Sequence, residues 1–335
     1  MSPRVAVIGC GYWGKNLVRV FHHLGALQLM CDVNPDRLRD LRVHYPDVGY
    51  STSIEEALCD ESVRGVVIAT PAGSHFTLAR EALAAGRDVF VEKPLAMSSG
   101  EGTQLVQEAS AREAILMVGH ILQYHPAIVS LKQIVDEGRL GDLYYLYSSR
   151  LNLGRVRQEE NILWSFAPHD ISVMLLLTGR LPESVAVFGG TYLQQEIADV
   201  TMSTYTFGQG VQAHIFVSWL HPFKEQRLVI VGSKQMAVFD DVATDAKLRI
   251  YDKGIAWVNG QPVPRQEAST NIQIPSTEPL DAECRHFLEC IERRITPRTD
   301  GWEGLRVLQV LEASQQSLAQ GRSVTLPPAG GLGGG

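Results

Sequence analysis

Three glycines near the N-terminus have the spacing that binds the pyrophosphate of a dinucleotide. They form the pattern Gly9-x-Gly11-x-x-Gly14, which follows an apolar run at 4–8 and opens a helical pattern at 13–24. The first glycine permits a tight turn, the second lets the backbone approach the pyrophosphate, and the third lets the helix pack closely on the strand. Because a helix N-terminus also attracts phosphate charge, these residues predict a dinucleotide-binding turn.

Asp32 indicates which dinucleotide binds. It ends a second apolar run, Leu27 to Cys31, and lies about 20 residues past the glycines, where a carboxylate accepts a hydrogen bond from the 2'-hydroxyl of the adenosine ribose. The same charge would repel a 2'-phosphate, and no arginine directly follows Asp32. We therefore expect NAD rather than NADP, with Arg37 as the nearest cation that opposes this preference.

Lys93 is the first candidate for proton transfer. It follows a predicted strand at 88–92 and precedes Pro94. A positively charged nicotinamide nearby would favour its neutral amine, the form that acts as a base; the alternative is a solvated loop lysine paired with Glu92. In open α/β sheets the ligand lies outside the carboxyl ends of the strands. We therefore expect these further side chains to border the cofactor: Tyr12, Trp13, Thr70, Pro71, His75, Glu92 and Lys93.

His169 is the second candidate, although a lone histidine is more often a packed or surface residue. A helix is predicted at 168–177, and Pro168 is suited to its first turn. His169 and Asp170 would then project from a helix start at the domain boundary, where a cleft is expected. The alternative for Asp170 is a charge that only complements the helix dipole.

Composition excludes several classes of protein. With 335 residues the chain exceeds what one core usually organises, so two domains are expected. The formal net charge of -7 and the absence of a long basic run argue against a nucleic-acid partner. No apolar stretch is long enough to span a membrane, and the first strand begins too early for a signal peptide.

The cysteines point to a reducing compartment. They are odd in number and lack Cys-x-x-Cys spacing, so neither a disulfide framework nor a zinc site is predicted: Cys10, Cys31, Cys59, Cys284 and Cys290. Reduced thiols are typical of the cytoplasm. We expect a cytoplasmic protein without a bound metal.

Up to about residue 120 the chain alternates short apolar strands with amphipathic helices, which is typical of a parallel, doubly wound sheet. Ser53 and Ser98 match capping boxes, and Gly25 and Gly86 stand where helices should end. Strands are predicted at 4–8, 27–32, 66–69, 88–92 and 115–118. We assign residues 1–121 to an α/β Rossmann dinucleotide-binding domain.

After a helix at 126–137, strands dominate the pattern. Val211, Ala213 and Ile215 alternate with polar neighbours, as on a sheet with one buried face. Strands are predicted at 143–152, 184–193, 199–207, 211–220, 226–232, 235–241 and 247–258, and two closing helices at 280–295 and 302–320. We assign residues 122–327 to an α+β substrate and oligomerisation domain with a large, mainly antiparallel open sheet, and 328–335 to a Gly-rich tail.

Together these motifs resemble the glucose-fructose oxidoreductase and inositol dehydrogenase family (Gfo/Idh/MocA). The resemblance rests on Gly-x-Gly-x-x-Gly, then Ala-Thr-Pro-x-x-x-His, then Glu-Lys-Pro, ahead of a β-rich second domain, and spans nearly the whole chain. It implies that Lys93 contacts the substrate hydroxyl near the nicotinamide and that His169 completes the site. The family often has an aspartate four residues before this histidine, where this chain has Ser165.

Three further runs resemble bacterial UDP-N-acetylglucosaminuronate 3-dehydrogenases: 11–16, 119–126 and 152–170. This resemblance implies NAD-dependent oxidation of a sugar C3 hydroxyl, with Lys93 or His169 as the base. It also implies a homotetramer formed through the second sheet, and a downstream aminotransferase on a route to diamino-uronate sugars of surface polysaccharide such as lipopolysaccharide O-antigen. The implied substrate residues are Lys93, Gln123, Tyr124, Asn152, Arg155, Arg157, Asn161 and His169.

The arginines give this resemblance a physical basis. Arg150, Arg155 and Arg157 cluster upstream of His169 in an otherwise acidic protein. A nucleotide-sugar uronate offers them a pyrophosphate and a carboxylate for bidentate contacts. The alternative is that they solvate one face of a strand. Two other functions stay open: a dehydrogenase of a free sugar or inositol, and a non-enzymatic NAD-sensing regulator, against which the presence of both Lys93 and His169 argues.

Overall fold

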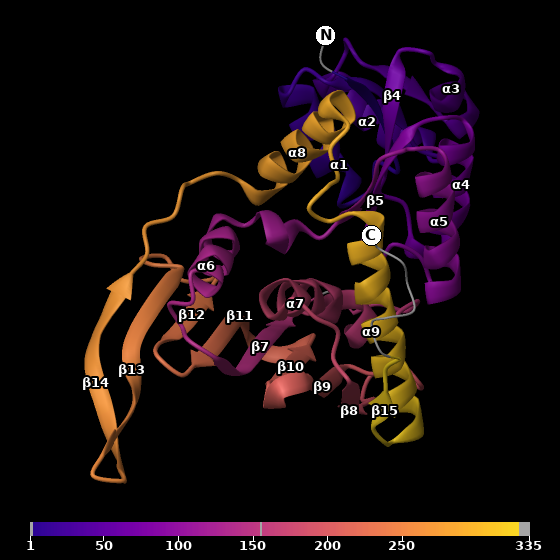
Figure 1. Ribbon diagram of the computed structural model, residues 1–335. Helices are drawn as coiled ribbons and strands as arrows, with labels where there is room; N and C mark the ends of the chain where they lie inside the picture. The colour runs from indigo at the N-terminus through magenta and orange to yellow at the C-terminus, as the bar shows by residue number, and fades with distance from the viewer. Residues whose placement is uncertain (1–2, 155, 328–335) are drawn as a thin grey trace. The chain divides into compact units, whose positions relative to one another are not determined.

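The computed structural model describes residues 3–154 and 156–327 (Figure 1). The chain divides into two compact units. Unit 1 contains residues 1–124 and 277–309, and unit 2 contains residues 125–276 and 310–335. Arg155 and the tail at 328–335, for which we predicted an anion contact and a Gly-rich tail, lie outside the described residues.

Unit 1 is built on a six-stranded parallel sheet in the order β3-β2-β1-β4-β5-β6, so the predicted Rossmann fold is confirmed. The strand order reverses between β1 and β4, which is where ligands bind in such sheets. The strands are β1 (Arg4–Ile8), β2 (Leu27–Cys31), β3 (Gly49–Ser51), β4 (Val63–Ile68), β5 (Asp88–Glu92) and β6 (Leu116–Gly119). Five helices lie between them: α1 (Gly14–His23), α2 (Pro35–His44), α3 (Ile54–Cys59), α4 (His75–Ala84) and α5 (Ser99–Ala111).

The helix ends of unit 1 follow the sequence signals. The side chains of Ser53 and Ser98 accept hydrogen bonds from the backbone N–H groups of Glu55 and Glu101. Gly25 has a positive φ of 66° directly after the C-cap of α1, where a side chain would be strained. Local hydrogen-bonding needs therefore set these boundaries.

A distant segment completes the core of unit 1. Helix α8 (Pro279–Arg293) packs against α1 and against η2 (Ile121–Tyr124). Its Phe287 is fully buried, with the ring centroid 5.6 Å from that of Phe90 on β5. The first half of α9 (Gly301–Gln320), up to residue 309, also belongs to unit 1. The observed units thus differ from a single division at residues 121/122, because the apolar stripe of α8 is buried in the first sheet's core.

Unit 2 contains a nine-stranded sheet in the order β14-β13-β12-β11-β7-β10-β9-β8-β15. Among the strand pairs that the structure describes in this sheet, β7 and β10 alone run parallel, which confirms the mainly antiparallel open sheet. The strands are β7 (Leu143–Leu153), β8 (Ser184–Gly190), β9 (Val200–Thr206), β10 (Gln212–Ser218), β11 (Leu220–Gly232), β12 (Met236–Asp240), β13 (Leu248–Val258), β14 (Gln261–Asn271) and β15 (Val324–Thr325).

Two helices cover one face of this sheet. Helix α7 (Ile162–Thr178) packs on β7, β9 and β10, and α6 (Pro126–Asp136) packs on α7 and β12 (Figure 1). The buried residues Ala213, Ile215 and Val217 of β10 alternate with more exposed neighbours, as predicted. We name the opposite side, which carries Tyr147, Phe188 and Met202, the open face of the sheet.

The start of α7 corrects the sequence analysis. The helix begins at Ile162, six residues before the predicted start, and Pro168 lies inside it. The side chain of Asn161 caps the helix by accepting from the backbone N–H of Trp164. Residues on all sides of α7 are buried, so no amphipathic stripe marked the first turns. Asp170 is therefore in the helix interior and does not complement the dipole at an N-terminus.

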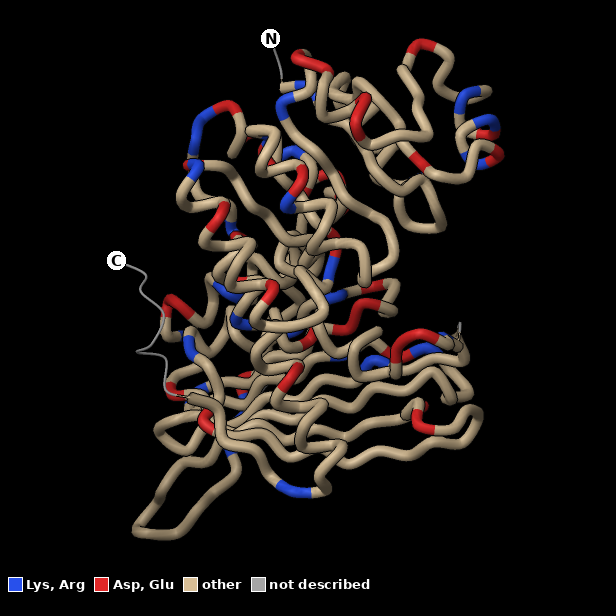
Figure 2. Tube along the Cα trace, turned by 90° about the vertical axis from the view of Figure 1, so that its right-hand side faces the viewer, with Lys and Arg blue, Asp and Glu red and all other residues tan. Residues whose placement is uncertain are grey.

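The distribution of charged residues and the lengths of the helices agree with the composition. Basic residues lie among acidic residues along much of the chain, and the strands of the large sheet have long stretches without charged residues (Figure 2). Within the described ranges, no helix is both long and apolar enough to cross a membrane. The short strands β3 and β15 and the hairpin strand β14 were not predicted, because each has few apolar residues.

Candidate functional site

The glycine turn has the geometry that its residue types require. Gly9 has a φ of +91°, and a Cβ atom there would lie 2.8 Å from the backbone of Ala69 and Thr70 at the end of β4. A Cβ on Gly14 would lie 1.8 Å from the carbonyl oxygen of Gly9. Any side chain would therefore push α1 off the sheet. A Cβ on Gly11 would meet only Arg37 Nη1, at 3.7 Å, so this side of the turn is open to a ligand.

Asp32 ties the glycine turn to the end of β2. Its Oδ2 accepts from the backbone N–H of Cys10 at 2.8 Å, and its Oδ1 accepts from that of Asn34, also at 2.8 Å. The side chain is almost fully buried. Each carboxylate oxygen has two lone pairs, so Oδ1 keeps acceptor capacity for a ribose hydroxyl. Arg37 Nη1 lies 3.4 Å from Oδ2 and is half exposed.

His75 differs from its expected role. It is only 1% exposed, and its ring bridges two backbone carbonyl groups, Thr70 at 2.9 Å from Nε2 and Pro94 at 2.8 Å from Nδ1. Thr70 Oγ1 accepts a hydrogen bond from Ser74 at 2.7 Å. The predicted cofactor residues Thr70, Pro71 and His75 are thus adjacent, but His75 holds the ends of β4 and β5 together, and in this way positions the residues around Pro94.

Glu92 connects the glycine turn with the strand end that carries Lys93. Glu92 Oε1 accepts from the indole Nε1–H of Trp13 at 2.5 Å. Trp13 is about one-third exposed and the neighbouring Tyr12 is exposed. Burial raises the pKa of the Glu92 carboxyl to about 7, against the hydrogen bond from Trp13 and the charge of Lys93, which both lower it. Glu92 therefore binds a proton more readily than an exposed carboxylate does.

Two predicted substrate residues lie in the interior of unit 1. Tyr124 is 4% exposed, and its hydroxyl is 3.1 Å from Thr299 Oγ1. Gln123 is 2% exposed, and its Nε2 donates to Glu303 Oε1 at 2.7 Å. The expectation that both side chains line a sugar pocket is corrected: α8 and α9 cover η2, a contact between segments far apart in sequence.

His169 is a half-buried residue of α7, and its neighbour Asp170 is locked to β7. Asp170 accepts from Ser148 Oγ at 2.6 Å and from Arg150 Nε and Nη2 at 2.7 and 3.2 Å. Arg150 is thereby used inside unit 2, with its side chain 12% exposed. It cannot be the free anion-binding guanidinium that the arginine cluster suggested; instead it fixes the helix turn that carries His169.

Asn152 follows on the same row of β7. Its Oδ1 is buried and, among the residues that the structure describes, accepts no hydrogen bond. A Cβ on Gly154 would lie 2.4 Å from this oxygen, so the glycine leaves room for it. A buried acceptor without a donor is costly, so this geometry is compatible with the predicted substrate role of Asn152.

Of the remaining predicted substrate residues, Asn161 is not available to bind a substrate and Arg157 is. Asn161 uses Oδ1 to cap α7 and donates from Nδ2 to Gln315 Oε1 at 2.8 Å, so its amide is already engaged. Arg157 has its side chain 45% exposed, and its Nε lies 3.8 Å from Glu160 Oε1. This loose pair leaves the guanidinium of Arg157 accessible to an anion.

Each unit contains its own group of predicted site residues. Unit 1 brings together the glycine turn, Trp13, Asp32, Thr70 and the Glu92–Lys93 strand end. Unit 2 contributes Asn152 and His169. Sequence reasoning missed the buried pair of His120 Nδ1 and Glu303 Oε2, 2.5 Å apart, because 183 residues separate them. No cluster of three metal-ligating side chains occurs within 3–154 and 156–327.

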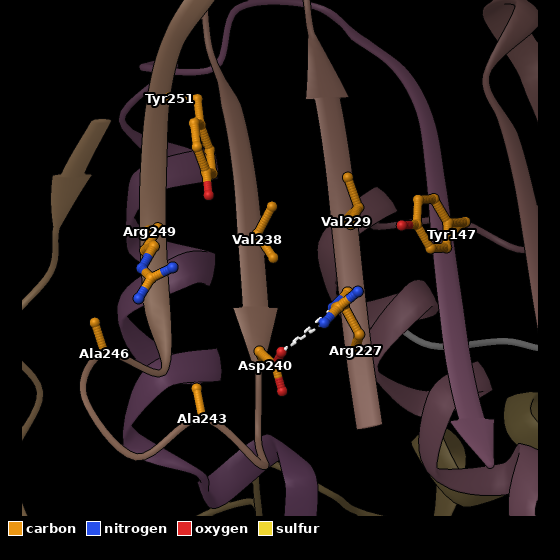
Figure 3. A pocket seen from close by; sticks show the side chains of 9 residues that line it. All are labelled: Tyr147, Arg227, Val229, Val238, Asp240, Ala243, Ala246, Arg249 and Tyr251. Carbon is orange, nitrogen blue, oxygen red and sulfur yellow. Dashed lines mark hydrogen bonds and ion pairs between the residues drawn. The ribbon is translucent and has the colours of Figure 1, made fainter. Parts of the chain in front are cut away.

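A cavity of about 260 Å³ lies elsewhere, on the open face of the large sheet (Figure 3). Strands β7, β11, β12 and β13 provide its walls, and Arg227 Nη2 is paired with Asp240 Oδ2 at 2.9 Å. Tyr147 and Tyr251 stand at opposite sides. None of the predicted site residues that the structure describes lines this cavity.

The geometry of unit 1 fits NAD. The open turn at Gly11, the α1 N-terminus and the spare acceptor of Asp32 suit a pyrophosphate and a ribose diol. A family model described as an oxidoreductase family with an NAD-binding Rossmann fold matches residues 3–120, and the model of the C-terminal domain of the same family matches residues 128–238. The protein is an NAD-binding oxidoreductase. The chain belongs to the Gfo/Idh/MocA family, and the predicted resemblance is confirmed.

Characterised relatives cover nearly the full chain. UDP-N-acetylglucosamine 3-dehydrogenase of Acidithiobacillus ferrooxidans is 29% identical over 91% of this chain and 94% of its own length. A crystal form of that enzyme has a TM-score of 0.84 at 27% identity, covering 95% of this chain and 97% of the other. Inositol 2-dehydrogenase of Burkholderia multivorans is 22% identical over 96% of this chain and 95% of its own length. The regulator alternative is set aside, because the family is one of enzymes.

The surroundings of Asp32 predict the choice of cofactor. NAD should be preferred at least about tenfold over NADP in kcat/KM, because the buried carboxylate would repel a 2'-phosphate at the ribose position. Arg37→Ala should widen this ratio, since the guanidinium beside Asp32 offsets part of the repulsion. Arg39→Ala, on the same helix but paired with Asp36, is the matched control. Equal or better activity with NADP in the unaltered enzyme would refute the assignment.

Proposed function

We propose that the protein oxidises the C3 hydroxyl of a UDP-linked N-acetylglucosamine-type sugar to the 3-keto sugar. The observation that carries this proposal is the similarity to UDP-N-acetylglucosamine 3-dehydrogenase over nine-tenths of the chain, with a Glu-Lys-Pro strand end in unit 1. NAD, when bound, takes the hydride from the sugar carbon. The residues of this chain then have to bind the sugar and remove the hydroxyl proton.

Lys93 and His169 are the proposed proton acceptors. Positioned bases typically contribute a factor of about 10² to 10⁴, and orientation of the sugar supplies much of the remainder. Several contacts support this pair. The His75 bridge fixes the backbone around Lys93, and the Asp170–Arg150 pair fixes the turn of α7 around His169. These contacts take the place of the aspartate that Ser165 does not supply.

UDP-N-acetylglucosaminuronic acid is the proposed substrate, and UDP-N-acetylglucosamine is the second candidate. The uronate substrate is supported by the accessible guanidinium of Arg157 and by Arg155, which the resemblance assigns to the uronate or pyrophosphate. The second is favoured by the name of the relative from Acidithiobacillus ferrooxidans. The engagement of Arg150 with Asp170 reduces the number of anion contacts available for a uronate.

The biological setting follows from that substrate. A 3-keto sugar is consumed by transamination, so we propose a downstream aminotransferase on a route to diamino-uronate sugars of surface polysaccharide, including O-antigen. The five cysteines are all free thiols, which supports a cytoplasmic location. An inositol or free sugar remains the alternative substrate, given the relative from Burkholderia multivorans.

We also propose a homotetramer that forms through the open face. Phe188 and Met202 pair across β8 and β9 and are 63% and 55% exposed on that face. Tyr145 of β7 is 41% exposed on the same side. Apolar patches of this kind on a sheet are typical of protein contacts.

The catalytic assignment predicts separate effects on chemistry and cofactor binding. Lys93→Met and His169→Asn should each lower kcat by about 10² or more, since each removes a proposed base. The Kd of NAD, measured by quenching of protein fluorescence, should stay within about twofold, because neither side chain is assigned to the pyrophosphate. Near wild-type turnover of both variants at saturating substrate would show that the catalytic assignment is wrong.

The uronate assignment predicts a graded substrate preference. A charge-assisted hydrogen bond contributes about 1.5 to 3 kcal/mol, so UDP-N-acetylglucosamine should be roughly ten- to hundredfold poorer in kcat/KM than the uronate. Arg155→Ala or Arg157→Ala should shrink that gap if the altered residue pairs with the carboxylate, and should weaken both substrates alike if it grips the pyrophosphate. Equal activity on both sugars removes the uronate claim, and indifference to UDP favours a free sugar.

The tetramer proposal is tested by charge on the open face. Phe188→Glu or Met202→Glu should lower the mass measured by light scattering after size exclusion, because either change buries a carboxylate in the contact. Val43→Glu is the control, since Val43 is an exposed apolar residue of unit 1, 77% accessible. A wild-type monomer, or a tetramer that survives both changes, contradicts this contact.

A further inference from the structure

Glu92 is placed where a second proton-transfer step could occur. It is the last residue of β5, directly before Lys93, and is only 9% exposed. The positive charge of Lys93 lowers the pKa of the Glu92 carboxyl. A carboxylate next to a lysine that has just taken a proton is a natural acceptor for that proton.

The carboxylate of Glu92 is held by fixed contacts. Trp13 donates to Oε1 from the glycine turn. On the other side, Glu92 is paired with Gly119 of β6, where a Cβ would lie 2.9 Å from Oε2. The missing side chain at Gly119 therefore makes the space into which this carboxylate fits.

Other ionisable groups surround Glu92 from three directions. Lys93 directly follows Glu92 at the end of β5. His120 directly follows β6, and its charge lowers the pKa of Glu92. Helix α8 contributes Glu283 and Cys284, both fully buried. Within the described part of the chain, neither oxygen of Glu283 has a hydrogen-bond partner. Burial and the charge of Glu92 raise the pKa of Glu283 well above its usual range.

We propose that Glu92 is a relay residue, whose carboxylate takes up the proton that Lys93 removes from the substrate hydroxyl. The O–H bond of the sugar breaks as an N–H bond forms on the neutral amine of Lys93. That ammonium then gives its proton to an oxygen of Glu92, which becomes a carboxylic acid and later loses the proton to solvent. The inference rests on the proposed role of Lys93, and it gives a task to the buried carboxylate that Trp13 holds directly before the base.

Trp13 offers a readout that needs neither cofactor nor sugar. Its indole N–H donates to Glu92, so its emission should change as Glu92 takes up a proton. The signal of Trp13 is the difference between the wild type and Trp13→Phe. We expect this difference to titrate near pH 7 in the wild type and to lose its titration in Glu92→Gln, which keeps an acceptor oxygen but binds no proton. A wild-type signal that is flat between pH 5.5 and 8.5 overturns the proposal.

The pH profile tests the relay itself. In the wild type kcat should decrease as the pH is lowered below about 7, because a protonated Glu92 cannot accept the proton from Lys93. Glu92→Gln should lose this decrease of kcat at low pH, the acidic limb of the profile, and should lower kcat at pH 8 by about tenfold or more. Glu283→Gln is the matched control: it alters a buried carboxyl that has no part in the relay, and it should keep the fall of kcat at low pH. A limb that persists in Glu92→Gln, or is lost only in Glu283→Gln, overturns the relay.

The proposed substrate and the relay can fail separately. The profile is measured with the UDP-sugar that the enzyme oxidises, or with inositol or a free sugar if neither UDP-sugar reacts. Inactivity on both UDP-sugars defeats the proposed function while the relay is still judged from the other substrate and from Trp13. Full activity on a UDP-sugar with an unchanged profile in Glu92→Gln defeats the relay alone.

Discussion

The parallel direction of the six strands in unit 1 is the constraint on which the site depends. All their carboxyl ends lie at one edge of the sheet, where Gly9, Asp32 and Lys93 directly follow β1, β2 and β5, and Thr70 lies two residues past β4. The chain needs no contact between distant loops to collect these groups. Two bonds then fix their spacing: Cys10 N–H to Asp32, and Trp13 to Glu92.

Much of this edge could be predicted from the sequence because its signals are local. A glycine at a positive φ, or a serine that caps a helix, expresses the needs of its own few residues. The positions of Gln123 and Tyr124 could not be read in this way. Their burial depends on α8 and on Glu303, which lie at least 155 residues further along the chain. The start of α7 was missed for a related reason, since a helix buried on all sides has no polar face to reveal its first turns.

The arginine cluster shows how similar side chains acquire different tasks. Arg150 and Arg157 are both basic residues before His169, yet one is 12% and the other 45% exposed as a side chain. Asp170 on α7 makes the difference, because its carboxylate accepts two hydrogen bonds from Arg150 in a partly buried place. Breaking such a pair leaves a buried charge and typically costs about 3 to 5 kcal/mol, so Arg150 serves stability and the alignment of α7.

The discontinuity of unit 1 has a consequence for synthesis of the chain. Its first 124 residues leave the ribosome before α8 exists, so Phe90 and the underside of α1 lack the ring of Phe287 that later covers them. Strands β7 to β14 of unit 2's large sheet are translated in the meantime. The core of the nucleotide-binding unit can therefore be completed only after residues 277–309 have been synthesised.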